Sequence, residues 1–273
     1  MHFDITPFDK ASHWLADGGL ETVMVFQEGI DLPDFASFHL FDTPDGRAAL
    51  TRCFERFAHL AAAEGAGLLL DTATWRSGAP WSEVVGRGIG ALERMNYEAV
   101  DFAKALRDTR APAGLPVVIN GVCGPAGDGY APDRMLTPVQ ADALHAPQIR
   151  WLADAGCDTL AAVTFTHTGE AIGWLRAAQA TGLPTLVSYT VETDGRLPSG
   201  QPLGDAIEET DAATDGGPLF YMINCAHPDH FRAALSAGDW RLRVGGLRGN
   251  ASRMSHAELD AAEELDEGDP QEF

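Results

Sequence analysis

The sequence contains few cysteines and no long apolar run. Only four of its 273 residues are cysteine, and none belongs to a Cys-x-x-Cys pair. In a chain of this length, isolated cysteines are typical of reduced thiols in the cytoplasm rather than of a disulfide scaffold. No stretch of about 18 apolar residues is present, and the first residues lack the pattern of a signal peptide. We therefore expect a cytoplasmic protein that does not span a membrane.

Basic residues are also scarce. The chain has 19 Lys and Arg against 40 Asp and Glu, a formal net charge of −21. A surface this negative repels phosphate groups, so neither nucleic acid nor an anionic membrane is an expected partner. In contrast, apolar residues make up 45% of the sequence, enough for a sizeable core. Small molecules are the expected partners.

The apolar residues that are present form seven short runs separated by longer amphipathic stretches. Buried parallel strands joined by helices have this pattern. The first run leads into Asp17-Gly18-Gly19 and not into the Gly-x-Gly-x-x-Gly of a Rossmann sheet. We predict a single (β/α)8 TIM-barrel domain over residues 1–273, with strands near residues 14–19, 68–74, 116–124, 158–165, 184–191, 219–225 and 242–247.

An eighth strand is missing from this pattern. After a helix predicted to begin at Ser255, the sequence becomes acidic and ends at Phe273 without another apolar run. A barrel of seven strands leaves two strand edges unpaired, which is unfavourable. We therefore expect a chain truncated at its C-terminus, or a homo-oligomer in which a partner chain supplies the missing strand.

Polar residues gather where the predicted strands end, on the side where TIM barrels build active sites. Asp17 has a carboxylate that can bind a substrate ammonium group, although it can also bond to its own turn. Cys225 can supply a thiolate to zinc, but an isolated cysteine is more often a buried apolar residue. The further candidates for substrate binding are Asn224, Thr72, Thr74 and Glu192.

Two histidines follow Cys225 closely. His227 and His230 form a His-x-x-His spacing, which allows a local zinc site with Cys225. However, Pro228 is expected to open a helix and to separate the two imidazoles. Helix capping and ordinary surface histidines are therefore the preferred interpretations of this pair.

Five segments, in order and at similar spacing, resemble the homocysteine S-methyltransferase family: 17–22, 71–76, 124–128, 170–171 and 223–225. The resemblance implies a TIM barrel and cobalamin-independent transfer of a methyl group to a thiol. It also implies zinc held by three cysteines, of which one matches Cys225. The other two are adjacent, in a Gly-Gly-Cys-Cys motif on the eighth strand. Asp17 matches the aspartate that holds the amino group of homocysteine.

This sequence departs from the family pattern twice. The Gly-Gly-Cys-Cys segment is not found and is expected beyond Phe273, which leaves zinc with one ligand of three. In addition, Val163 or Thr164 stands where some members use a glutamate to bind the substrate ammonium. The expected reaction is methyl transfer from a sulfonium or quaternary ammonium donor to homocysteine, giving methionine. The alternatives are a metal-dependent barrel hydrolase using His227, His230 and Glu192, and a non-catalytic paralogue.

Overall fold

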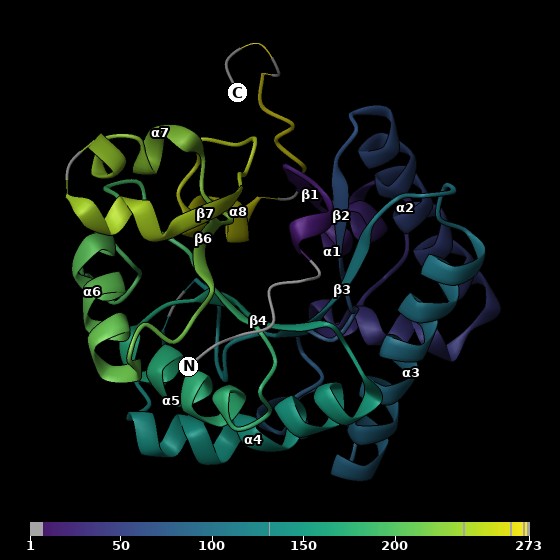
Figure 1. Cartoon of the computed structure of the whole chain (residues 1–273), viewed down its shortest axis with the longest axis horizontal. Helices are drawn as coiled ribbons and strands as arrows, with labels where there is room; N and C mark the ends of the chain where they lie inside the picture. The colour runs from purple at the N-terminus through teal and green to yellow at the C-terminus, as the bar shows by residue number, and fades with distance from the viewer. Residues whose placement is uncertain (1–7, 131, 237, 263, 270, 272–273) are drawn as a thin grey trace. The chain divides into compact units, whose positions relative to one another are not determined.

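The strands form one sheet in the order in which they occur along the chain. The structure, a computed structural model, describes residues 8–130, 132–236, 238–262, 264–269 and 271. Within these residues the sheet has seven strands in the order β1 to β7 (Figure 1). By its internal contacts the chain divides into two compact units. The first unit consists of residues 1–123, 145–161 and 181–184, and the second of residues 124–144, 162–180 and 185–273.

The first unit is built on β1 (Trp14–Ala16), β2 (Gly67–Asp71) and β3 (Val117–Cys123), in which β2 pairs in parallel with both neighbours. Helix α1 is short (Leu20–Thr22), α2 (Pro44–Ala63) packs on β2, and α3 (Ile89–Thr109) packs on β3 (Figure 1). Thr43 caps α2 by accepting a hydrogen bond from Gly46 N at 3.0 Å. The apolar side chains of Leu50 and Phe54 on α2 are buried.

The second unit contains β5 (Thr185–Tyr189), β6 (Phe220–Asn224) and β7 (Val244–Arg248), again paired in parallel. Its helices are α5 (Thr168–Gln179), α6 (Leu203–Thr214), α7 (Pro228–Phe231) and α8 (His256–Ala261). Two further elements, α4 (Pro138–Ala155) and β4 (Thr159–Phe165), contribute residues to both units.

The structure confirms all seven predicted strands and the helix starts predicted at Pro228 and Ser255. Ser255 and Glu258 form a capping box at the start of α8. Thr137 and Gln140 bond reciprocally before α4, at 3.0 and 3.4 Å. At both of these helix starts a side chain satisfies an otherwise unpaired backbone N–H group.

The order of strands and helices confirms the predicted fold class. Parallel strands in sequential order, with helices between them, define a (β/α)8 barrel, of which the described residues hold seven strands. After Ala261 the described residues contain neither helix nor strand, and residues 263, 270, 272 and 273 of the predicted acidic end lie outside them. No helix among the described residues is long and apolar enough to cross a membrane.

Candidate functional site

Cys225 follows β6 in an unusual backbone conformation. Its φ is 54°, in the left-handed region that non-glycine residues rarely adopt, and Thr164 in β4 has a φ of 65°. Such conformations cost on the order of 1–3 kcal/mol each and are concentrated at functional sites. The Cys225 N–H donates to Arg248 O on β7 at 3.1 Å, which fixes the cysteine at the end of the strand.

The side-chain amide of Asn224 holds this region together. Its Oδ1 accepts hydrogen bonds from Thr164 N at 3.1 Å and from the Ser188 hydroxyl. Its Nδ2 donates to Thr164 Oγ1 at 2.7 Å and to Cys225 Sγ at 3.2 Å. These four bonds use the whole capacity of the amide. Asn224, one of the candidates for substrate binding, therefore joins three strands and directs an N–H donor at the thiol.

His256, the first residue of α8, contacts both Glu192 and Cys225. Its Nδ1 is 2.9 Å from Glu192 Oε1, and its Nε2 is 2.9 Å from Cys225 O. Both partners are oxygen atoms that accept hydrogen bonds, so each ring nitrogen faces an acceptor. The predicted site residue Glu192 thus contacts the Cys225 backbone through one buried imidazole.

Tyr130 covers His256 from the loop that follows β3. The two rings stack with centroids 4.0 Å apart and planes 12° apart. The charge of a Cys225 thiolate, burial of the ring and a hydrogen bond to the Cys225 side chain together raise the pKa of Tyr130 well above its usual value. The phenol therefore stays neutral, as an O–H donor. Tyr130, Cys225, His256, Asn224 and Glu192 are called the thiol cluster below.

Two acidic side chains shape the loop that carries Tyr130. Glu170, buried in α5, accepts a hydrogen bond from Ala126 N at 2.7 Å. Asp128 accepts one from Tyr130 N at 2.7 Å. Glu170 belongs to segment 170–171, one of the five that resemble the family. Its hydrogen bond holds the glycine-rich loop 124–128, which is another of the five.

His227 and His230 do not join the thiol cluster as metal ligands. His227 caps α7, with Nδ1 accepting from Asp229 N at 3.1 Å, as the position of Pro228 predicted. The ring centroids of the two histidines lie 5.9 Å apart. No group of three His, Cys, Asp or Glu side chains in the described ranges is arranged to hold a metal ion.

The remaining predicted residues lie in the first unit. Asp17 is 4% exposed, and its Oδ1 accepts a hydrogen bond from Asp71 N at 3.1 Å. The hydroxyls of Thr72 and Thr74 are 2.6 Å apart. Thr74 donates to Val122 O at 2.7 Å, and Thr72 accepts from Val122 N at 3.0 Å. Both threonines thus join β2 to β3 through their side chains.

The zinc implied by the resemblance does not fit the donors present at Cys225. Zinc sites in proteins need three or four ligand atoms with free lone pairs. The Cys225 sulfur instead faces an N–H donor from Asn224 and the phenol of Tyr130. Both ring nitrogens of His256 are directed at other oxygens. The local chemistry is that of a hydrogen-bonded thiol.

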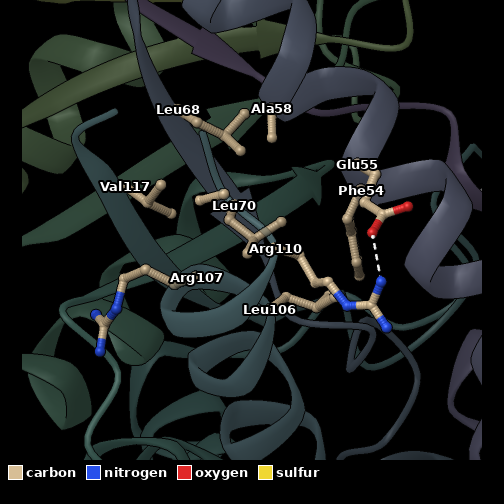
Figure 2. A pocket seen from close by; sticks show the side chains of 10 residues that line it. Phe54, Glu55, Ala58, Leu68, Leu70, Leu106, Arg107, Arg110 and Val117 are labelled. Atoms are coloured by element: carbon tan, nitrogen blue, oxygen red, sulfur yellow. Dashed lines mark hydrogen bonds and ion pairs between the residues drawn. The ribbon is translucent and has the colours of Figure 1, made fainter. Parts of the chain in front are cut away.

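A small cavity lies elsewhere, in the first unit. Apolar side chains of α2, α3, β2 and β3 line it, among them Phe54, Leu70 and Leu106, and Glu55 pairs with Arg110 at 3.4 Å beside it (Figure 2). Its free volume of about 10 Å³ is near the minimum for one water molecule. The cavity is a packing gap between helices and sheet rather than a substrate site.

Sequence reasoning missed Tyr130 and His256 as members of the thiol cluster. His256 directly follows Ser255, where a helix was predicted to begin, so its place in the chain was predicted but its partners were not. Tyr130 ends the glycine-rich segment after β3. An aromatic residue in such a loop was the feature of the sequence that could have identified it. Ser188 was missed because it carries no motif.

The strand order and the polar clusters at the carboxyl ends of the strands define an enzyme of the (β/α)-barrel class. A sequence model of the homocysteine S-methyltransferase family matches residues 14–264, and the chain belongs to this family of enzymes. Two solved structures of the homocysteine methyltransferase MmuM from Escherichia coli are similar in fold. The metallated form has a TM-score of 0.68 at 20% identity, covering 94% of this chain and 97% of that one. The oxidized form has a TM-score of 0.69 at 21% identity, covering 93% and 96%. No curated protein sequence matches the chain.

Proposed function

We propose that this chain transfers a methyl group from a sulfonium or quaternary ammonium donor to the thiol of homocysteine, giving methionine. Membership of the family, carried by the match over residues 14–264, is the observation that supports this acceptor. The net charge of −21 favours a cationic donor. S-methylmethionine, S-adenosylmethionine and betaine all have such a methyl group.

The reaction needs a deprotonated acceptor and a positioned donor. The acceptor sulfur attacks the methyl carbon, and the bond from that carbon to the donor breaks. Its electron pair stays on the donor, which leaves as a neutral thioether or tertiary amine. Because the donor carries a good leaving group, positioning and removal of the thiol proton are the main tasks of the protein.

We propose that Glu192 is the base that accepts the proton of the acceptor thiol. This carboxylate contacts His256 and has a side chain 32% exposed, so a substrate can reach it. The contact with His256 Nδ1, at 2.9 Å, fixes the position of this carboxylate. Asp17 is proposed to bind the amino group of the acceptor, because it matches the aspartate that has this role in the family.

The test is direct detection of methionine. The purified full chain is incubated with homocysteine and each of the three donors, with and without added zinc, and methionine is measured by mass spectrometry. We expect methionine from at least one donor, and a loss of rate of about 100-fold in Glu192→Gln. Glu208→Gln, at an exposed position on α6, is the matched control and keeps the rate. No methionine under any of these conditions would overturn the proposed function.

A further inference from the structure

The segment that follows β2 places an arginine against two tryptophans. The guanidinium carbon of Arg76 lies 4.8 Å from the centroid of the Trp75 ring and 4.2 Å from that of the Trp81 ring. Contact with aromatic rings takes place through the face of a guanidinium, whereas its N–H groups point outward in its plane. The two rings therefore fix the plane of the half-buried Arg76 side chain and direct its hydrogen bonds along the edge of the group.

A strained turn receives one of these hydrogen bonds. Arg76 Nη1 donates to the backbone oxygen of Asp34. Asp34 and the next residue, Phe35, have φ values of 54° and 52°, in the left-handed region that non-glycine residues rarely adopt. Backbone of this kind is unfavourable and is concentrated at active sites and ligand clamps. Arg76 thus connects an aromatic cradle to a turn whose conformation needs support from its surroundings.

The guanidinium lies at the end of the sheet where the amino group of the substrate is proposed to bind. Arg76 follows β2 at its carboxyl end, the side on which barrel enzymes bind their substrates. Burial raises the pKa of Glu21, and nearby Asp71 and Arg76 respectively raise and lower it through their charges. Asp71 in turn donates its backbone N–H to Asp17 Oδ1 at 3.1 Å. A fixed cation is therefore present in the same group of charged residues as Asp17.

We propose that Arg76 binds the α-carboxylate of the amino-acid substrate. The inference rests on the proposed function and deepens it, because homocysteine, S-methylmethionine and S-adenosylmethionine are all α-amino acids. In a chain with a net charge of −21, a carboxylate ligand needs a local cation. A guanidinium fits a carboxylate through two parallel N–H···O bonds, and a guanidinium that is already held flat loses little freedom when it binds.

Binding of substrates with and without their carboxylate tests the proposal. The full chain is titrated in a calorimeter with homocysteine, with S-methylmethionine, and with the decarboxylated counterpart of each. We expect the wild type to bind at least one of the two amino acids about 10- to 100-fold more tightly than its counterpart. In Arg76→Met this preference should disappear, while the affinity for the counterpart stays as in the wild type. Arg76→Lys keeps the charge without the two-point geometry and should retain only part of the preference.

Arg47→Met is the matched control. Arg47 is also half-buried in the first unit, stacks on Phe41 at 5.4 Å and pairs with Glu98, so its replacement should leave the preference unchanged. If Arg76 only supported the turn at Asp34, its removal would weaken binding of an amino acid and of its counterpart equally, and that result would overturn the inference. A wild type without preference for the carboxylate would overturn it as well. If circular dichroism shows that Arg76→Met does not fold, partial loss or persistence of the preference in Arg76→Lys decides.

Each titration contains one substrate, so no methyl group is transferred and failure of the two proposals is distinguishable. A preference for the carboxylate that depends on Arg76 supports the inference even where no methionine is formed, and then the proposed function alone fails. The same data separate the two sources of the carboxylate. A preference confined to homocysteine and its counterpart assigns Arg76 to the acceptor, and one confined to S-methylmethionine and its counterpart assigns it to the donor.

Discussion

The two units use similar polar side chains at the ends of their strands for different purposes. In the first unit, the hydroxyls of Thr72 and Thr74 bond to the main chain of β3. In the second unit, the amide of Asn224 bonds mainly to other side chains, one of them the Cys225 thiol. A polar residue at the end of a barrel strand is therefore not functional by position alone. The destination of its hydrogen bonds separates residues that join strands from residues that prepare a reactive atom.

The cysteines show the same difference. Cys53 and Cys157 are buried in the first unit, where burial raises the pKa of Cys53 to about 11 and that of Cys157 to about 12. Thiols with such values are inert near neutral pH. Cys225 is partly exposed and has hydrogen-bond donors around its sulfur. The second unit thus holds the thiol that is available for chemistry.

The largest expected effect is that of Asn224→Ala. The change removes four hydrogen bonds and leaves the buried Thr164 N–H without its acceptor. We expect the free energy of unfolding to fall by about 3 kcal/mol and methyl transfer to be lost. Urea unfolding followed by circular dichroism measures the first effect. Asn250→Ala, which removes one bond to Ser252 N at 3.3 Å, is the control and should cost less than about 1 kcal/mol. A similar small loss in both variants would contradict the role given to Asn224.

The counterpart in the first unit is Thr74→Val. The substitution keeps the shape of the side chain but removes the donor to Val122 O in a fully buried position. We expect a loss of stability of about 1–2 kcal/mol and unchanged kcat and KM in the folded fraction. Thr51→Val on α2, which removes a bond to Arg47 O at 2.9 Å, is the control at a partly exposed position. A raised KM with unchanged stability would show instead that Thr74 binds substrate and that the two units do not differ in this way.

The fold was predictable from sequence because burial controls it. Strands of a parallel sheet are covered on both faces, so they appear as apolar runs such as residues 158–165 and 184–191. Capping boxes mark helix starts because only a few side chains can satisfy the first N–H groups. These signals are local, so one sequence is enough to read them.

The thiol cluster was only partly predictable because its contacts are not local. Cys225 and Asn224 are adjacent, and one motif identified both. The stacking of Tyr130 on His256 joins a loop after β3 to the start of α8, and no periodicity in the sequence connects them.

The smallest expected effect is that of Tyr130→Phe, and its pH dependence identifies the cause. The variant keeps the ring on His256 but removes the hydrogen bond to Cys225. We expect a loss of about 1 kcal/mol in unfolding free energy near neutral pH. Because folding raises the pKa of Tyr130, the unfolded chain loses this proton first as pH rises. The stability that depends on the neutral phenol is therefore fully present below about pH 10 and declines above it.

Unfolding free energies of wild type and Tyr130→Phe, measured from about pH 8 to about pH 11, test this sign. The difference in unfolding free energy between them should stay constant up to about pH 10 and then shrink. The reason is that only the wild type has a phenol whose contribution to stability is lost at high pH. Tyr97→Phe on α3, outside the thiol cluster, serves as the control for loss of a tyrosine. A difference that stays the same over the whole range would mean that Cys225 and burial do not keep Tyr130 neutral. In that case the thiol cluster would lose one of the two donors that distinguish it from the threonines of the first unit.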